Sequence, residues 1–326
     1  MNRIVLSTTL TLAAFTPFAM RGQDLPDNLN RFSFGPTFGL NFKADFHNNA
    51  NPGPPVTHAG GANHTYNDGY VRPDSSGDAG GLTQNWGYQY KSQYNPANGG
   101  TMNFLNVGSS SATGNPQYGG ELIYQRVVGS LPFLSGDWGL EAGFGFTELD
   151  LRENLSGTAS VDSYSLGGNL PPDPGNGGIS GAPQALLGDT PTRYAAKLTG
   201  YQKLSGQMFS LRLGPFAEWN ITHKLSLAAS VGLTLAPTMV DYDFSETAIL
   251  AGGGTITESG HSSKTELLYG PYVGAMLRYD LTKCWGIYVG ARFQNLNDLD
   301  QSIGGRTARL DQSATVYGTA GVSWRF

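Results

Sequence analysis

The feature that most constrains this chain is a period-two alternation of apolar and polar residues within several long segments. In the last seventeen residues, Leu310 to Phe326, the even positions from Ala314 onward are apolar or glycine, and the odd positions are mainly polar. A second segment, Arg31 to Phe46, carries five phenylalanines on its even positions. Successive side chains of a strand point to opposite faces, so both segments are predicted to be strands with one apolar and one polar face.

The same pattern predicts about ten strands, with eight or twelve as alternatives because the pattern is weak in 86–90, 101–107 and 119–128. The predicted strands are 31–46, 86–90, 101–107, 119–128, 138–147, 209–221, 225–235, 267–281, 285–293 and 310–326. Long loops are expected at 47–82, 152–204, 251–264 and 295–309, where Gly, Pro, Asn and Ser gather. Within the second of these loops, 158–164 and 194–202 can extend the strands on either side.

Composition supports an all-β chain. Gly occurs 46 times, aromatic residues make up 11% and charged residues only 14%, against roughly a quarter charged in a typical soluble protein. A net charge of −5 argues against nucleic acid as a partner, because that partner needs a basic face. The single cysteine, Cys284, excludes an intramolecular disulfide and is expected to be a small apolar filler in a turn.

The first 22 residues form a segment of their own. A short basic start, Asn2-Arg3, precedes an apolar run from Ile4 to Ala19, and Gln23-Asp24 begins a polar segment. This order is typical of a secretory signal peptide. We therefore expect residues 1–22 to be a signal peptide and residues 23–326 to form one domain.

Several features favour a membrane barrel over a soluble sandwich. No other stretch approaches 18 consecutive apolar residues, so a membrane-spanning form must cross with strands, and only a closed barrel satisfies every backbone group in lipid. The predicted connections alternate between short turns and long loops. Aromatic residues at the short-turn ends of strands predict a girdle at the lipid–water interface, made by Trp138, Trp219, Trp285, Trp324 and Phe326. The fold expected is an antiparallel, up-and-down transmembrane β-barrel.

The closing strand, with its alternating faces and terminal aromatic residue, resembles the C-terminal strand of bacterial outer-membrane β-barrel proteins. The resemblance covers the chain from Phe32 to Phe326 at the level of architecture. It implies a monomer in the outer membrane of a Gram-negative-type bacterium, surrounded by outer-membrane lipid, with short periplasmic turns and long extracellular loops. It also implies that the strand 310–326 is recognised by the barrel-assembly machinery.

Charged residues on the polar faces are expected to line the lumen. They are Arg212, Glu218, Glu266, Arg278 and Arg292. Two interpretations remain open: these side chains line a narrow polar channel, or they pair with one another and plug the lumen. A small barrel is filled largely by its own side chains, which favours the plug.

A catalytic or metal site is not expected. Only His261-Ser262-Ser263 puts a base beside a hydroxyl, which leaves a membrane-embedded hydrolase as an alternative. The spacing of His47, His58 and His64 matches no rigid metal-ligand motif, and the Asp/Gly clusters 74–78 and 298–300 are typical of turns. We therefore expect a non-enzymatic barrel without a cofactor, whose loops serve envelope structure or surface interaction; a narrow pore or small-solute transporter is the other alternative.

Overall fold

The structure is a computed structural model that describes residues 30–48, 64–65, 72–74, 85–95, 101–114, 116–131, 136–165, 192–303 and 305–326. The predicted signal peptide, residues 1–22, lies outside these ranges. Among the described residues the only helical element is a single 3₁₀ turn, η1 (Lys91–Gln93). None of the described helices has the length and apolarity needed to span a bilayer.

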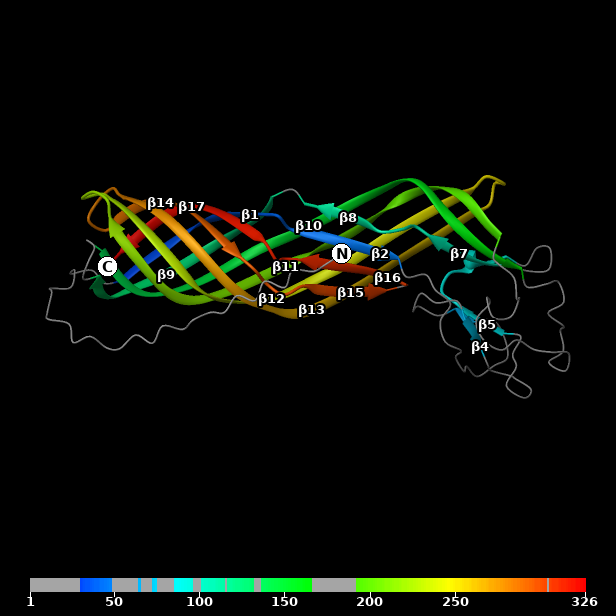
Figure 1. The fold of residues 1–326 in the computed structure, drawn as a ribbon, viewed down its shortest axis with the longest axis horizontal. Coiled ribbons are helices and arrows are strands. Elements are labelled where there is room, and N and C mark those ends of the chain that lie inside the picture. Colours follow the sequence, from blue (N-terminus) through cyan, green and yellow to red (C-terminus); the bar gives the residue numbers. More distant parts are fainter. Residues whose placement is uncertain are drawn as a thin grey trace, which may run out of the picture.

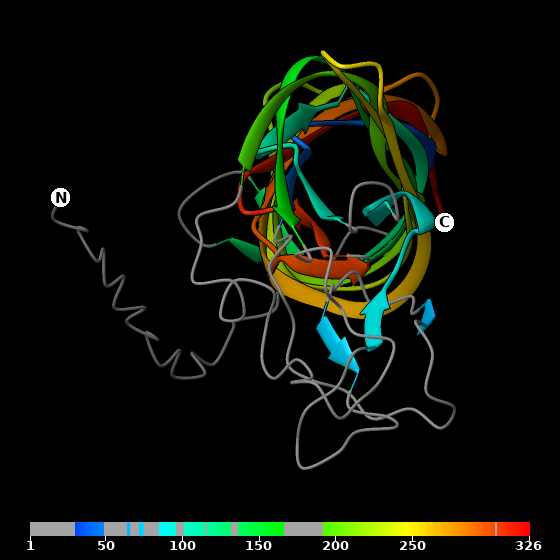
Figure 2. The ribbon, with the colours of Figure 1, turned by 90° about the vertical axis from the view of Figure 1, so that its right-hand side faces the viewer.

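Eight antiparallel strands close into a ring (Figures 1 and 2). They are β1 (Asn30–Leu40), β9 (Gln117–Leu131), β10 (Gly136–Ser165), β11 (Thr192–Asn220), β12 (Leu225–Leu250), β13 (Thr255–Asp280), β14 (Trp285–Gln294) and β17 (Thr315–Arg325). Each pairs with the next in this order, and β17 pairs with β1 to close the ring, with Phe32 opposite Trp324. The predicted up-and-down barrel is confirmed, and the pairing of its first and last strands closes it. The ring contains eight strands, one of the expected alternatives.

The barrel continues well beyond the ring on one side. A second sheet, in the order β15, β16, β2, β8, prolongs four of the ring strands. Its strands are β2 (Lys43–Asn48), β8 (Ser110–Thr113), β15 (Leu299–Ile303) and β16 (Arg306–Asp311). The other four ring strands, β10 to β13, run uninterrupted through both parts, and in Figure 1 they extend far to the right of the C-terminus. The short turns and the C-terminus lie together at the opposite end.

Three predicted loops are in fact largely strand. The region 152–204 holds the outer halves of β10 and β11, which pair as far as Ser163 opposite Thr192 and confirm that 158–164 and 194–202 extend these strands. The predicted loop 251–264 is strand from Thr255, and 295–309 contains β15 and most of β16. Outside lipid a strand needs no apolar outer face, so the apolar alternation fades although the backbone ladder continues.

Two predicted ring strands lie elsewhere. Part of 86–90 is β5 (Asn85–Tyr88), which forms a small sheet with β3 (His64–Thr65) and β4 (Arg72–Asp74). Most of 101–107 is β7 (Thr101–Asn106), which pairs only with the outer end of β10 and with β6 (Tyr94–Asn95). Both segments were too short to cross a membrane, which explains why they stand outside the ring.

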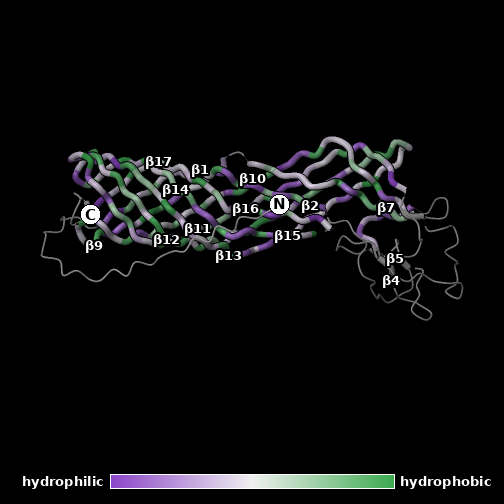
Figure 3. Tube along the Cα trace, in the orientation of Figure 1, coloured by the Kyte–Doolittle hydropathy of each residue, from purple (hydrophilic) through white to green (hydrophobic). Residues whose placement is uncertain are grey.

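β12 shows where the membrane ends. Its even-numbered side chains face the lumen along the whole strand, and its odd-numbered side chains face outward. From Leu225 to Met239 the outward residues are apolar, and Leu233 keeps 66% of its surface exposed. From Asp241 they are mostly polar. A belt of outward apolar side chains on a closed barrel is the signature of a lipid-facing surface, so the bilayer surrounds the part of β12 below Asp241. In Figure 3, hydrophobic and hydrophilic residues alternate along the ring strands.

The single strand predicted for 31–46, with one apolar face throughout, is interrupted in the structure. β1 ends at Leu40, and Asn41 adopts a positive φ of 62°. After this residue the phase reverses, so that Phe42, Ala44 and Phe46 point inward and are buried. Apolar and polar residues alternate without interruption in the sequence, but the left-handed conformation of one residue exchanges the inward and outward faces of the strand. Outside the membrane, an apolar side chain that points outward would contact water and not lipid. Apolar side chains are therefore more stable there when they point into the lumen and are buried.

Candidate functional site

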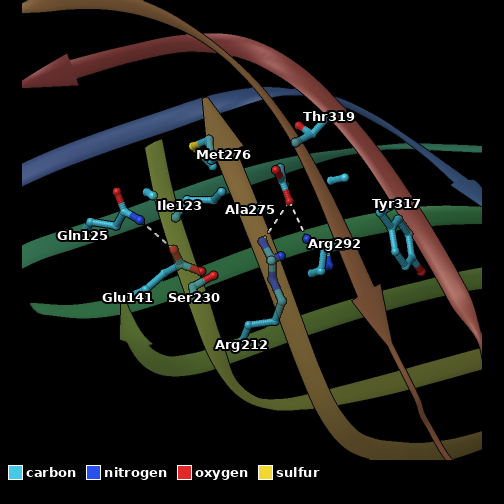
Figure 4. A pocket seen from close by; sticks show the side chains of 14 residues that line it. Ile123, Gln125, Glu141, Arg212, Ser230, Ala275, Met276, Arg292, Tyr317 and Thr319 are labelled. Atoms are coloured by element: carbon cyan, nitrogen blue, oxygen red, sulfur yellow. Dashed lines mark hydrogen bonds and ion pairs between the residues drawn. The ribbon is translucent and has the colours of Figure 1, made fainter. Parts of the chain in front are cut away.

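The membrane-embedded lumen contains a buried group of ion pairs. Arg212 on β11 and Arg292 on β14 both bind Oε2 of Glu121 on β9, at 2.8 and 2.7 Å. The guanidinium of Arg292 also lies 4.4 Å from the centre of the Tyr317 ring. Figure 4 shows Arg212, Arg292 and Tyr317 beside a cavity, on different strands. The glutamate therefore links three strands that are not neighbours in the ring.

A second ion-pair group lies beside the first. Glu218 on β11 accepts from Arg31 on β1 at 2.6 Å and from Arg278 on β13 at 3.0 Å. Arg278 also donates to Gln125, whose side-chain amide donates to Glu141 at 2.6 Å. Every one of these five side chains is buried. Four arginines and three glutamates thus cross-link the lumen within the membrane.

The space left in this part of the lumen is small. The cavity bordered by Glu121, Glu141, Arg212 and Arg292 has a volume of about 30 Å³, and one buried water needs roughly 10–15 Å³. The cavity therefore has room for about two water molecules.

Four of the five predicted lumen residues belong to these groups. Arg212, Glu218, Arg278 and Arg292 are each less than a tenth exposed. Glu266 lies apart, near the outer edge of the lipid belt, where its carboxylate binds Lys264 at 2.7 Å and remains about a third exposed. Glu266 shares the inward parity of β13 with Arg278, but it stands at a level where β13 has passed the end of β14, apart from the other four.

Sequence reasoning missed two important members, Arg31 and Glu121. Arg31 stands at the first residue of the predicted strand 31–46, and Glu121 lies in the segment whose faces were ambiguous. Counting from Glu121, the inward positions of β9 are Glu121, Ile123 and Gln125. The available signal was a polar residue on either side of Ile123 at a spacing of two, namely Glu121 and Gln125. The apolar Ile123 between them hid this polar face.

An apolar layer closes the lumen above the ion pairs. Its members are contributed by both the ring and the second sheet: Phe42, Phe46, Leu149, Leu151, Leu204, Met208, Val240, Tyr242, Phe244, Leu268, Leu299 and Leu310. The rings of Phe46 and Tyr242 stack with centroids 5.8 Å apart. All of these side chains are at most 2% exposed, so the extramembrane half has a packed apolar core.

The predicted girdle residues lie at the short-turn end. Trp285 and Trp324 are direct partners on β14 and β17, and their rings stack at 6.3 Å. Phe326 stacks on Trp324 at 4.7 Å and on Phe32 at 5.6 Å. Trp138 and Trp219 stand at the same end of β10 and β11. The terminal residue thus joins the first and last strands through ring contacts.

The outer face just above the lipid belt carries a histidine with a carboxylate and a hydroxyl. His261 Nδ1 lies 2.7 Å from Asp243 Oδ1, its direct cross-strand partner. His261 Nε2 lies 3.4 Å from the Ser263 hydroxyl, which itself donates to Asp241 at 2.5 Å. The hydrogen bond and charge of Asp243 raise the pKa of His261 above its ordinary value. This pairing was invisible in the sequence because 18 residues separate the two partners.

The remaining sequence candidates lie apart. His47 contacts Ser109, His58 lies outside the described residues, and Asp298 pairs with Arg309. In the described part of the chain no three His, Cys, Asp or Glu side chains are placed to hold a metal ion. Cys284 is exposed in its turn, so the expectation of a packed filler is wrong.

Comparison with known proteins yields similarity to outer-membrane proteins. No family model and no curated protein matches the chain. Among solved structures it is similar to Ail, the attachment invasion locus protein of Yersinia pestis, with 11% identity over 92% of this chain and 99% of that chain and a TM-score of 0.30.

Two further structures cover the chain to a similar extent. The outer membrane protein OprG from Pseudomonas aeruginosa has 11% identity over 92% of this chain and 97% of that one, with a TM-score of 0.33. The outer membrane protease OmpT from Escherichia coli has 12% identity, the same coverage and the same TM-score. At these values no residue role is transferable. The closed ring and its outward apolar belt are the evidence that the chain is a transmembrane β-barrel similar to small outer-membrane barrels.

Proposed function

We propose that this protein is a non-enzymatic, non-conducting barrel in the outer membrane of a Gram-negative-type bacterium. It acts as a monomer that holds a rigid extension above the cell surface for envelope structure or surface interaction. The observation that supports this most is the filling of the lumen by side chains: the ion pairs centred on Glu121 and Glu218 are followed by a packed apolar layer. A solute path would have to break both.

The extension itself suits a surface role. β10 and β11 remain paired far beyond the lipid belt, from Glu148 opposite Gln207 to Ser163 opposite Thr192. Its inside is packed with apolar side chains, and its outside carries hydroxyl, carboxylate and basic groups such as Asp243 and His261. A closed, filled scaffold of this kind keeps an exposed surface in fixed geometry.

Surface labelling on intact cells tests the proposed orientation. Ser259 lies on the outer face of the extension, and Lys224 lies in a turn at the opposite end. In a Cys284→Ser background, a membrane-impermeant maleimide should label Ser259→Cys on intact cells and label Lys224→Cys only after the cells are lysed. Labelling of Lys224→Cys alone on intact cells would reverse the orientation and contradict the proposal.

One observation favours a second candidate function, hydrolysis of an ester at the membrane surface. Asp243, His261 and Ser263 lie in the order and near the spacing of an acid–base–nucleophile relay. Against it, the Ser263 hydroxyl donates to Asp241 and not to the histidine.

Ester turnover in mixed micelles distinguishes the two candidates. Hydrolysis predicts turnover that Ser263→Ala and His261→Ala both abolish and that Ser259→Ala, on the same face of β13, leaves intact. Absence of turnover in the wild-type protein excludes the second candidate.

A further inference from the structure

A second charged group is buried inside the extension, away from the membrane. Glu246 on β12 and Glu258 on β13 are direct cross-strand partners on the inner face. Arg306 on β16 reaches between them: its Nη2 binds Glu246 at 2.7 Å and also binds Glu258. All three side chains are at most 2% exposed. The group therefore sits in a low-dielectric interior where its charge balance matters.

The charges in this group do not balance. Two carboxylates face one guanidinium, which leaves one negative charge in excess when both glutamates are ionised. Among the described residues, the polar groups of Gln202 on β11, Asn48 on β2, and the phenols of Tyr90 and Tyr242 also lie beside them, and these groups are neutral. Burial raises the pKa of both tyrosines, so these phenols stay protonated.

The two glutamates differ in their hydrogen bonds. Glu246 uses both oxygens, accepting from Gln202 at 2.6 Å and from Arg306. Glu258 uses Oε2 only, and among the described residues its buried Oε1 has no hydrogen-bond partner. An unpaired buried carboxylate oxygen is costly. The excess negative charge and the unpaired oxygen therefore converge on Glu258.

A short segment covers this group at the mouth of the barrel. Around η1, Gln89 and Gln93 are buried, and Tyr90 packs against the apolar layer. The segment 88–95 is tied to β13 by the Ser92 hydroxyl, which donates to the carbonyl oxygen of Thr257 at 2.9 Å. It is tied to β7 by Asn103, which donates to the carbonyl oxygen of Gln93 at 3.4 Å. Thr257 is adjacent to Glu258 in β13, so the cap and the carboxylate share one strand.

We propose that Glu258 is a proton-binding site whose protonation holds the cap, residues 88–95, closed over the mouth of the extension. A proton on Oε1 removes the excess charge and turns the unpaired acceptor into a donor. Consistent with this, burial, opposed by Arg306 and reinforced by Glu246, raises the pKa of Glu258 to about 7. Loss of the proton restores the uncompensated charge beside the cap and β13.

The sign of the pH effect follows from linkage. The closed state binds the proton with a pKa of about 7, against 4.5 for a glutamate in water. The free energy that protonated Glu258 contributes to closure is therefore fully present below the pKa of the open state. It is lost as pH rises through the pKa of the closed state. Between about pH 5.5 and about pH 8.5 the opening equilibrium should therefore rise roughly 30-fold, provided that opening exposes Glu258 to water.

Hydrogen–deuterium exchange of the full-length protein in detergent tests this proposal, with labelling times corrected for the intrinsic pH dependence of exchange. The wild-type cap should exchange roughly 30-fold faster at the higher pH. Glu258→Gln, which mimics the protonated side chain, should stay protected at both pH values. Glu148→Gln, on the outer face of β10, should behave as wild type. A wild-type cap insensitive to pH, or a Glu258→Gln cap that still opens, overturns the proposal.

A second variant tests whether the pH dependence of the cap comes from the excess negative charge or from side-chain packing. Glu246→Gln leaves Glu258 and Arg306 as a balanced pair, so the pKa of Glu258 should fall and the pH-dependent rise in exchange should shrink. An undiminished rise in exchange contradicts a role for the excess charge.

Repeating the wild-type measurement in sodium chloride and in choline chloride tests whether the ligand is a proton. Protection at high pH in sodium alone would assign the site to a metal cation and overturn the assignment to a proton.

Discussion

The side-chain amide of Asn41 donates a hydrogen bond to the backbone carbonyl oxygen of Ala314, at 3.4 Å. The two residues lie where β1 gives way to β2 and β16 to β17. Below them apolar side chains face lipid, and above them apolar side chains face the lumen. Asn41 achieves this reversal with a φ of 62°, a conformation that asparagine and glycine tolerate best.

Substitution at Asn41 should therefore depend on backbone freedom more than on polarity. Asn41→Val should destabilise the folded barrel by about 1–2 kcal/mol, the typical cost of a left-handed residue with a Cβ branch. Asn41→Gly should cost much less. Denaturant unfolding of the purified protein in detergent measures both, and equal losses in the two variants would argue against a conformational role.

Removing the shared carboxylate of the membrane lumen should be far more damaging. Glu121→Gln leaves Arg212 and Arg292 with no anionic partner at that position, and breaking a buried pair typically costs about 3–5 kcal/mol. Glu148→Gln on the outer face should change stability by at most about 0.5 kcal/mol. The same unfolding measurement compares them, and a mild effect of Glu121→Gln would indicate that water reaches the arginines.

The surface histidine offers a pH readout of its own. Asp243 raises the pKa of His261, so in Asp243→Asn that pKa should move back down toward the ordinary value. Protonation of His261 therefore strengthens this contact at low pH, and the contribution is lost as pH rises through the raised value. NMR titration of the imidazole signals checks the shift; an unchanged titration in the variant would contradict the pairing.

Deleting Phe326 should affect assembly of the barrel more than the stability of the folded barrel. Its ring contacts Phe32 and Trp324 at the rim, so a barrel already folded should lose little. If the strand 310–326 is the signal for the assembly machinery, the level of folded protein in the outer membrane should fall much more. Gel mobility of unheated and heated membrane samples reports the folded level. Normal levels of the truncated protein would count against the signal.

The fold class was predictable from the sequence because a strand that crosses lipid needs an apolar residue at every second position. The outward faces of β12, β13 and β14 are readable in 225–239, 267–280 and 285–293 as an almost unbroken alternation. Beyond the membrane the same strands carry Ser, Thr, Asp and Glu on the outside, so their letters resemble a loop. The pattern of 31–46 misled because the phase reversal at Asn41 leaves no trace in hydrophobicity.

The site was less accessible for a different reason. Arg212, Glu218, Arg278 and Arg292 stand out as charges on otherwise apolar strands, and their burial follows from the parity of each strand. Their partners depend on which strands face each other across the lumen and on the stagger between them. Contacts such as Arg31 with Glu218, which are 187 residues apart, are properties of the closed ring.

The central claim is that the lumen is blocked by the ion pairs at Glu121 and Glu218 and by the apolar layer above them. Single-channel recording of the folded protein in a planar lipid bilayer tests it most directly. The account predicts a flat current trace for wild-type protein whose insertion is verified independently. Reproducible, discrete conductance steps from the pure, folded wild-type protein would contradict it.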